Sequence, residues 1–345
     1  MKILFIGPHK PYNNDAHIQY LILKKIYKNV DVIHPYKSFF FPFISLRVFQ
    51  HISPNLLLPF INNYILSRVK KEYDLIYVKV GELISEKLIL KLKTKTKKIV
   101  FYCNDNPFVK RDKNKWILFL RAAKYYDLIT YHDYSRIKLS RKIGLKNSLL
   151  VTPPYDKKIH RRQKLSNFDK KKFKNDVVFV ATWSPQKGIF LKKLIDLGLK
   201  VKIYGTRWDK DPNYKSLKSV TTLCHLSGKN YSKVIQSAKI ALCLFAEGNL
   251  DTITTRSTEI PAIGTLLFSL RTTAMKNILI EKKEAIYFNN PNECFKKCIF
   301  YLKNHNIAKK IAMRGHKKIT RVLKISNDDL IKKIINKVFE KKNES

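Results

Sequence analysis

An arginine and a glutamate stand three residues apart in the stretch TTRSTEIPAIG, residues 254–264. Apolar runs at 239–245 and 265–270 flank the stretch and a glycine closes it, so we expect a helix that follows a strand. The N-terminus of such a helix offers free N–H groups and the positive end of a dipole, which suit a phosphate. Arg256 adds a planar, permanently charged group for phosphate oxygens. Glu259, on the same face, can accept hydrogen bonds from vicinal hydroxyls such as a ribose diol.

Arg256 and Glu259 also have a simpler interpretation, an ion pair that stabilises the first helical turn. Acids in that turn are favoured by about 0.3–1 kcal/mol without any ligand, and an i,i+3 ion pair adds about 0.2–0.5 kcal/mol. A capping box does not explain Glu259, because it needs Ser or Thr three residues earlier, where Arg256 stands. These residues alone leave a ligand and an ion pair about equally supported.

Two further loops carry groups that suit a phosphorylated ligand. The segment ATWSPQKG (181–188) follows a strand and brings Lys187 and Gly188 into the first turn of the next helix, which is a place for a diphosphate. The run YGTRW ends the next strand and supplies Arg207. The first loop of the chain, at 7–15, holds one glycine, and the absence of a G-x-G-x-x-G fingerprint argues against an NAD enzyme.

The elements that must position these loops alternate along the chain. Apolar strand-like runs are separated by amphipathic stretches of helical period, which predicts βαβ units and parallel sheets covered on both faces. The expected strands are 2–7, 30–35, 74–80, 98–105, 127–133, 148–154, 177–182, 200–205, 239–245, 265–270 and 284–289. The expected helices include 17–28, 85–95, 115–126, 187–197, 230–238, 253–263, 291–303, 305–316 and 328–341.

This alternation predicts two domains in an α/β chain of 345 residues. We expect two Rossmann-like, doubly wound domains that face a central cleft, with ligands at the carboxyl ends of the strands. The predicted boundaries are 1–155 for the first domain, 156–176 for a polar linker and 177–325 for the second domain. The last segment, 326–345, is predicted to form a helix that packs back on the first domain.

The charge of the chain is strongly positive, with 69 Lys and Arg against 26 Asp and Glu. Such a surface attracts nucleic acids, anionic lipids or phosphorylated substrates. The lysines are dispersed, however, and no zinc-ligand spacing, basic zipper region or RNA-binding aromatic signature accompanies them. Nucleic acid is therefore the less favoured partner.

Cysteine usage and the chain start give expectations about metals and location. Five cysteines without paired motifs indicate free thiols in a reducing setting, and no metal site is predicted. The start, MKILFIGPHK, reads as a first strand and not as a signal peptide, so we expect a cytoplasmic protein.

The most apolar region, 37–66, is interrupted by prolines and polar residues. It does not reach the ~18 uninterrupted apolar residues that span a bilayer. A buried helical insertion is the default expectation, and a dimer face or a patch resting on an anionic membrane are the alternatives. We therefore expect a cytoplasmic protein, with peripheral contact to the inner face of the membrane as an open question.

The chain resembles a known family at this point. The run DTITTRSTEIPAIGTLLFSLRTTAMKN and its continuation to residue 319 are similar to the donor half of spore-maturation (CgeB-like) glycosyltransferases, which have the GT-B fold. The similarity extends over most of 176–319, including YGTRW, and is fainter at 74–108. It implies an enzyme that transfers a sugar from a nucleotide-sugar, UDP- or GDP-linked, to a glycan, lipid-linked or protein acceptor, without a further cofactor and without a metal.

The resemblance also implies roles for residues at matching positions. Retaining enzymes of this fold commonly carry two acids eight residues apart, as Asp251 and Glu259 are here. Glu259 would bind the ribose and Asp251 would face the donor sugar or diphosphate. The chain departs from the pattern at Thr182, where an arginine is often found, and in having Asp as the first acid. The implied donor-binding set is Glu259, Arg256, Lys187, Gly188, Arg207 and Thr255.

An inverting enzyme would need a general base on the first domain. Asp105 and His9 are our candidates, since both follow strand ends, and His132 has a similar place. Two other functions stay open: a basic nucleic-acid-binding protein without catalysis, and a nucleotide-sugar epimerase of the same fold. The sequence does not identify the sugar, the acceptor, the stereochemical outcome or the oligomeric state.

Overall fold

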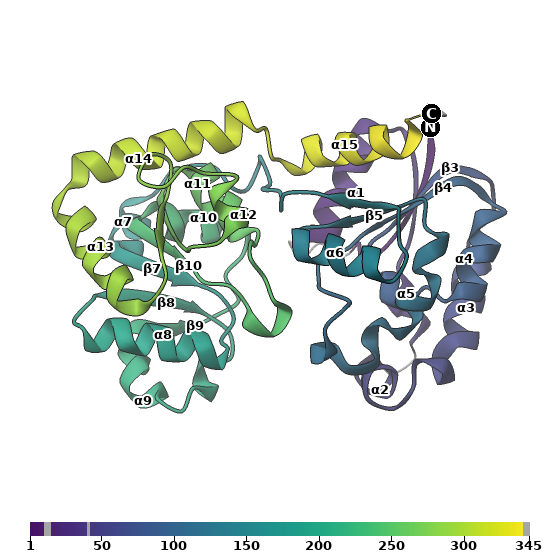
Figure 1. Cartoon of the computed structure of the whole chain (residues 1–345), viewed down its shortest axis with the longest axis horizontal. Coiled ribbons are helices and arrows are strands. Elements are labelled where there is room, and N and C mark those ends of the chain that lie inside the picture. The colour runs from purple at the N-terminus through teal and green to yellow at the C-terminus, as the bar shows by residue number, and fades with distance from the viewer. Residues whose placement is uncertain (10–14, 40–41, 341–345) are drawn as a thin grey trace. The chain divides into compact units, whose positions relative to one another are not determined.

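The computed structural model describes residues 1–9, 15–39 and 42–340. The chain divides into two compact units. Unit 1 comprises Met1–Thr152 and the C-terminal segment that begins at Asn327, and unit 2 comprises Pro153–Ser326. Each unit is built on a six-stranded sheet in which all strand pairs are parallel, with helices on both faces (Figure 1). The predicted α/β class with two doubly wound sheets is confirmed.

The sheet of unit 1 has the strand order β2-β1-β3-β4-β5-β6. Its strands are β1 (Lys2–Ile6), β2 (Asn29–Ile33), β3 (Tyr73–Val78), β4 (Thr96–Tyr102), β5 (Leu128–Tyr131) and β6 (Ser148–Leu150). Its helices are α1 (Asp15–Ile26), α2 (Pro42–Arg47), α3 (Leu58–Leu66), α4 (Glu86–Lys93), α5 (Ile117–Ala122), α6 (Tyr134–Lys142) and α15 (Asn327–Phe339). The central strands are apolar along most of their length because helices cover both faces of the sheet.

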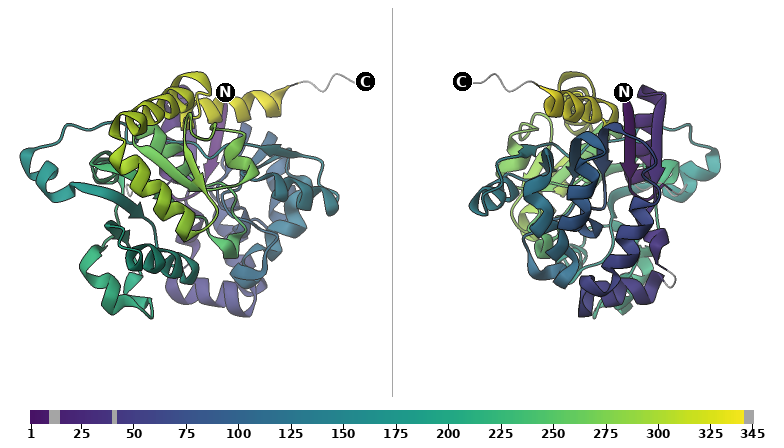
Figure 2. Two further views of the ribbon diagram at one scale, coloured as in Figure 1. Left: turned by 60° about the vertical axis from the view of Figure 1, so that its left-hand side comes forward. Right: turned by 90° about the vertical axis from the view of Figure 1, so that its right-hand side faces the viewer.

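The sheet of unit 2 has the order β12-β11-β10-β7-β8-β9. Its strands are β7 (Asn175–Val180), β8 (Val201–Gly205), β9 (Thr221–Leu223), β10 (Ala238–Cys243), β11 (Leu266–Leu270) and β12 (Ile286–Phe288). Its helices are α7 (Asn167–Phe173), α8 (Pro185–Asp196), α9 (Tyr214–Leu217), α10 (Gly228–Gln236), α11 (Arg256–Ile263), α12 (Thr273–Lys276), α13 (Pro291–Lys303) and α14 (His305–Lys317). The left view of Figure 2 shows α13 and α14, in yellow-green, beside the strands of this sheet.

The segment 156–176 differs from the expected linker. Pro153 already belongs to unit 2, and the polar segment is attached to α10. The Ser232 hydroxyl donates to the carbonyl oxygen of Ile159 at 2.6 Å, and the amide of Gln163 donates to the Gln236 side chain at 2.7 Å. Hydrogen bonds from polar side chains and backbone groups, and not a buried apolar face, join the segment to α10. Its sequence therefore shows no apolar periodicity.

The hydrophobic region 37–66 is partly buried and partly exposed. Its buried side chains, among them Phe49 and Ile61, belong to the core of unit 1. Ile52 and Phe60, in contrast, are 65% and 57% exposed. The expected burial therefore holds for one face only, and the part of the region at 40–43 lies outside the residues whose side chains are described. In the described part of the chain, no helix is long and apolar enough to span a membrane.

Helix α15 packs in unit 1. Ile331 and Ile334 are fully buried, in one cluster with Phe5 of β1 and Leu75 of β3. The helix also contacts α1, and the two lie side by side in Figure 1. The last helix therefore supplies part of the core that covers one face of the first sheet.

We expect the Ile331→Ala variant to lower the free energy of unfolding by about 2–5 kcal/mol, because it leaves a cavity in this core. Urea denaturation followed by circular dichroism measures the change. The matched control is Lys332→Ala, at an exposed position of the same helix, which should unfold like the wild type. Equal midpoints for Ile331→Ala and wild type would contradict the packing of α15.

Candidate functional site

The candidate site lies at the carboxyl ends of β7 and β10 in unit 2. These two strands pair directly although β8 and β9 come between them in the chain, so the strand order reverses here. In doubly wound sheets such a switch point leaves a crevice between loops that run to opposite faces. The loop after β7 leads to α8, and the loop after β10 leads to α11. The topology therefore brings together the two segments that the sequence singled out.

Glu259 lies in the first turn of α11 and is 9% exposed. Its Oε1 lies 3.7 Å from Nε2 of His160. The backbone N–H of Asp156 donates to Nδ1 of His160 at 2.9 Å, so that nitrogen is the acceptor and the ring proton resides on Nε2, toward Glu259. The carboxylate of Glu259 thus has the Nε2 edge of the His160 ring as a neighbour, at a separation longer than a hydrogen bond.

Arg256, the first residue of α11, does not pair with Glu259: within the described chain no ion pair joins them. Its Nη1 donates to the hydroxyl of Thr255 at 3.3 Å, and its guanidinium lies 5.7 Å from the ring centre of Tyr231. Nε of Arg256 is buried and has no hydrogen-bond partner among the described residues. Burial opposes the charge, but Glu259 and other neighbours outweigh it and raise the pKa of Arg256. The simple ion-pair interpretation of this segment is therefore not what the structure forms.

Lys187 approaches the same place from α8. It is the third residue of that helix, and its Nζ donates to the carbonyl oxygen of Thr182 at 3.4 Å. Burial and then the charge of Arg256 lower the pKa of Lys187. The N-cap residue of α8, Ser184, makes no side-chain capping bond, so the first N–H groups of this 12-residue helix are not capped by it. Two cations and an uncapped helix N-terminus converge, which is the electrostatic pattern of an anion site.

Asp251 and Thr255 lie on the loop between β10 and α11. The Asn249 side chain donates to Oδ1 of Asp251 at 2.6 Å, and Leu250 between them has a left-handed backbone with φ of 51°. The charge of Asp251 acts to raise the pKa of Lys187, against the larger effects of burial and Arg256. The structure thus places Asp251 within electrostatic range of this lysine.

Gly188 and Arg207 stand apart from this group. A Cβ at Gly188 would lie 1.8 Å from Oδ2 of Asp211, so packing requires a glycine at this position. Arg207 is exposed and has a left-handed backbone after β8, with φ of 65°. Asp211 is buried, and it accepts from the indole of Trp183 at 2.7 Å.

Two residues of the site escaped the sequence analysis. His160 lies in the segment expected to be a linker, and Tyr231 lies on α10, its ring in edge contact with His160 at 5.6 Å between centres. Burial and then the charge of Glu259 raise the pKa of Tyr231. For His160 the only sequence signal was the histidine itself. The surrounding charged residues at 156–162 show no periodicity, so the segment was interpreted as a linker.

The predicted acceptor-side residues lie in unit 1, at the carboxyl ends of its strands. Asp105 follows β4 and is ion-paired, 3.2 Å from Nζ of Lys115 and 3.6 Å from Nη2 of Arg111. His9 follows β1, with its ring in edge contact with His34 at 5.4 Å. His132 follows β5, and burial, assisted by Arg136, lowers its pKa to about 3, which keeps it neutral over the ordinary pH range.

Lys79, directly after β3, is a buried cation of unit 1 that the sequence analysis did not single out. Its side chain is 3% exposed and is ion-paired with Asp15, and Nζ also donates to Asn104 at 3.3 Å. The ammonium lies 3.7 Å from the ring centre of Tyr102. Lys79 lies inside the apolar run 74–80, and that run predicts a strand without indicating a role for the lysine. Across the residues described in both units, no three His, Cys, Asp or Glu side chains are grouped to hold a metal ion.

We expect Gly188→Ala to destabilise unit 2 by about 1–3 kcal/mol, because the new methyl group overlaps the buried Asp211 carboxylate. Thermal unfolding measures the loss. Gly198→Ala serves as the spatial control, since nothing lies within 4 Å of a Cβ there and only its positive φ of 89° opposes the change. A Gly188→Ala protein as stable as the wild type would show that Asp211 can move away, and the packing role would be wrong.

The comparisons with known proteins agree with this architecture. Residues 186–327 match the family described as glycosyl transferase-like. No curated protein matches the sequence. HepE from Anabaena, solved in complex with UDP, is similar with a TM-score of 0.69 and 13% identity, covering 98% of this chain and 99% of that one. Sucrose-phosphate synthase from Thermosynechococcus elongatus is similar with a TM-score of 0.72 and 11% identity, again covering 98% and 99%.

A third similar structure matches over a smaller part of both chains. TarM of S. aureus, solved as a point mutant with Fondaparinux, alpha-GlcNAc-glycerol and UDP, has a TM-score of 0.60 and 12% identity. The match covers 83% of this chain and 59% of that one. None of these comparisons supports a nucleic-acid-binding protein or an epimerase. The chain has the GT-B fold, and residues 186–327, most of its second unit, are similar to the glycosyl transferase-like family.

Proposed function

We propose that this protein is a glycosyltransferase that transfers a sugar from a UDP-linked donor to a glycan acceptor. The observation that carries the proposal is the convergence of Lys187 and Arg256, two like charges, at the switch point of a sheet. Bringing two cations together costs free energy unless an anion joins them. The choice of UDP over GDP is supported by the similar HepE structures, which hold UDP and UDP-glucose. Membership of the CgeB-like family itself remains a prediction.

The proposed donor site assigns one task to each group. Lys187, Arg256 and the N-terminus of α8 bind the diphosphate, and Glu259 accepts hydrogen bonds from the ribose hydroxyls. His160 holds the Glu259 carboxylate in its orientation, as a positioning residue. Asp251 faces the sugar or the diphosphate. Thr255, Gly188 and Arg207 were part of the predicted set, and of these we retain Thr255, as the hydroxyl that orients Arg256.

The proposed reaction breaks the bond between the anomeric carbon and the diphosphate oxygen and forms a bond from that carbon to an acceptor oxygen. The diphosphate leaves with the bonding electrons, and the cations of the site stabilise the charge that develops on it. No metal or further cofactor is part of this proposal. The acceptor hydroxyl gives up its proton to a base, for which Asp105 and His9 are the candidates. Lys115 and Arg111 hold the Asp105 carboxylate in place through its two ion pairs.

The proposed setting rests on the charge of the chain. We propose that the enzyme works in the cytoplasm, with its acceptor at the anionic inner face of the membrane. A lipid-linked glycan is then the favoured acceptor class, ahead of a protein. The net charge of +43 supports this setting, since it draws the protein to anionic surfaces.

Arg256→Ala and Lys187→Ala should each weaken UDP binding about ten- to a hundredfold, because each removes a hydrogen-bonded charge from the diphosphate. Isothermal titration of the purified protein with UDP, GDP and their sugar conjugates measures the affinities. Lys193→Ala, an exposed position on α8, is the matched control and should bind as the wild type does. If both site variants bind UDP normally, the donor site lies elsewhere.

A sharper test addresses Glu259. The wild type should prefer UDP over 2′-deoxy-UDP, and Glu259→Ala should lose that preference, because the carboxylate is the proposed acceptor for the ribose hydroxyls. Binding of both nucleotides to both proteins gives the comparison. A variant that still discriminates against the deoxy nucleotide would remove Glu259 from the ribose site.

His160→Ala should raise KM for the donor about three- to tenfold with little change in kcat, since it frees the carboxylate of Glu259 without touching the reacting atoms. His160→Gln should recover part of the loss by supplying an N–H donor. Lys164→Ala, exposed in the same segment, is the control. A purely structural histidine would lower the melting temperature but leave the preference for UDP over 2′-deoxy-UDP intact, and that result would contradict the positioning role.

A further inference from the structure

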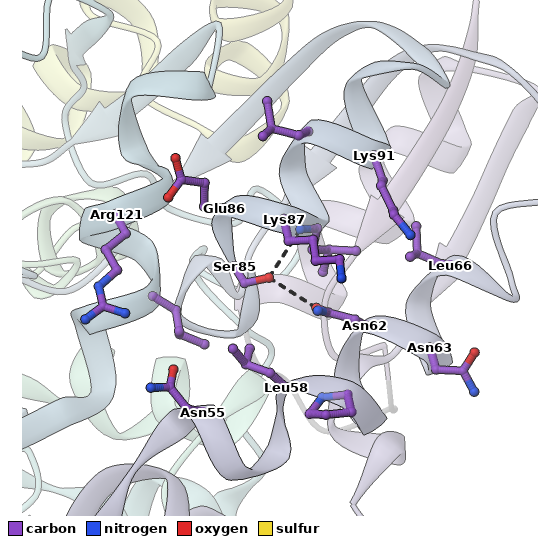
Figure 3. A pocket seen from close by; sticks show the side chains of 14 residues that line it. Asn55, Leu58, Asn62, Asn63, Leu66, Ser85, Glu86, Lys87, Lys91 and Arg121 are labelled. Carbon is purple, nitrogen blue, oxygen red and sulfur yellow. Dashed lines mark hydrogen bonds between the residues drawn. The ribbon is translucent and has the colours of Figure 1, made fainter.

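A groove of about 870 Å³ opens between α3, α4 and α5 of unit 1 (Figure 3). Its lining combines aliphatic side chains, among them Leu58, Leu66 and Leu88, with polar and charged ones. Asn62 of α3 accepts from the hydroxyl of Ser85 at 3.2 Å, which ties α3 to the start of α4. The right view of Figure 2 shows these helices, in blue-purple, along one side of unit 1. None of the residues assigned to donor binding lies in this groove.

Large apolar side chains are exposed beside the groove. Leu56, in the 3-10 turn before α3, and Phe60, in the first turn of α3, are 58% and 57% exposed. Ile61 and Ile65 of α3 are fully buried and fix this helix to the core. Leu90 of α4, which lines the groove, is 45% exposed. Large exposed apolar side chains on neighbouring segments are typical of a surface that contacts another apolar phase.

The charges around these side chains are almost all positive. Lys87 and Lys91 of α4 and Arg121 of α5 line the groove, and Figure 3 shows the two lysines on the side of Asn62 and Leu66. Glu86 is the only acid in the lining, and the hydroxyl of Tyr125 donates to it at 2.5 Å. In the sequence no Asp or Glu occurs between Asp31 and Glu72, which covers all of α2 and α3.

We propose that this face of α3 and α4 docks on an anionic phospholipid bilayer. The exposed Leu56, Phe60 and Leu90 side chains would enter the boundary between headgroups and acyl chains, as the apolar face of an interfacial helix does. Lys87 and Lys91 would then lie at the level of the lipid phosphates, where each basic residue near the surface contributes measurably to binding. The face requires both contributions, since neither a few apolar groups nor a few charges bind a membrane tightly alone.

Charge complementarity favours a bilayer over the other occupants. A second copy of the chain joined through the same face would set Lys87, Lys91 and Arg121 of both copies against one another, since such an interface is self-complementary. A nucleic acid would use the charges but would gain nothing from exposed leucines on a groove wall. An anionic lipid surface matches both the cations and the apolar side chains.

The inference rests on the proposed function only for its consequence, which is to bring the enzyme to a lipid-linked acceptor. Binding to lipid and binding to UDP are measured separately, the first on a face of unit 1 and the second on residues of unit 2. Failure of one measurement therefore leaves the other informative.

The experiment is co-flotation of the full chain with vesicles of phosphatidylcholine alone and of phosphatidylcholine with phosphatidylglycerol. We expect binding to the mixed vesicles only. The Leu56→Ser, Phe60→Ser double variant should lower the vesicle partition coefficient about tenfold or more. The Lys87→Glu, Lys91→Glu double variant should also lower it about tenfold or more, with UDP affinity and melting temperature unchanged in both variants.

Two matched controls separate this face from general stickiness and general charge. Phe168→Ser with Ile189→Ser removes apolar groups of unit 2 that are 70% and 68% exposed, and should float like the wild type. Lys170→Glu with Lys171→Glu removes the same net charge from α7 and should retain most of the binding. Equal flotation of the α3 or α4 variants and their controls overturns the proposal. So does flotation that is independent of phosphatidylglycerol, or light scattering that shows the Leu56→Ser, Phe60→Ser variant converting a dimer to a monomer.

Discussion

The direct pairing of β7 with β10 is the constraint on which the candidate site depends. Two strands, β8 and β9, lie on the other side of β7, so the chain must return past its first strand before it continues the sheet. The loops after β7 and β10 consequently leave the sheet next to each other and run to opposite faces. Lys187 and Arg256, 69 positions apart in the sequence, come into electrostatic contact for this reason alone.

A buried carboxylate in the first turn of a helix needs a partner, and the structure supplies one from a distant segment. His160 reaches Glu259 because Asp156 forms a turn in which its carboxylate accepts from the amides of Lys158 and Ile159 at 2.7 and 2.8 Å. The same turn presents the Asp156 amide to His160, which fixes the tautomer. Arg256, one turn earlier, keeps a buried Nε without a hydrogen-bond partner in the described part of the chain.

The fold could be predicted from the sequence wherever burial requires a regular pattern of apolar residues. Strands such as β3 and β10 are nearly continuous apolar runs because helices cover both their faces, and all but one of the strands coincide with expected runs. The exception is β9, three residues at a sheet edge, whose threonines carry no apolar signal. Arg256 and Glu259 were found from helix-terminus chemistry, whereas the partner of Glu259 was not, since contacts between segments so far apart in the sequence leave no local pattern. At Gly188 the sequence suggested a ligand, whereas the requirement for glycine imposed by the neighbouring Asp211 side chain left no sequence signal.

The division of the chain into units gives a last consequence, for synthesis on the ribosome. Unit 2 is one continuous segment, whereas unit 1 is completed by α15, whose Ile331 and Ile334 fill its core. A nascent chain therefore exposes the apolar surface of β1 and β3 during the whole time in which unit 2 is made, since domains fold as their residues emerge. Unit 1 is thus synthesised first but can complete its core only after unit 2 has been made. Translation of residues 153–326 is thus an interval in which a chaperone has a defined hydrophobic target, the surface that α15 later covers.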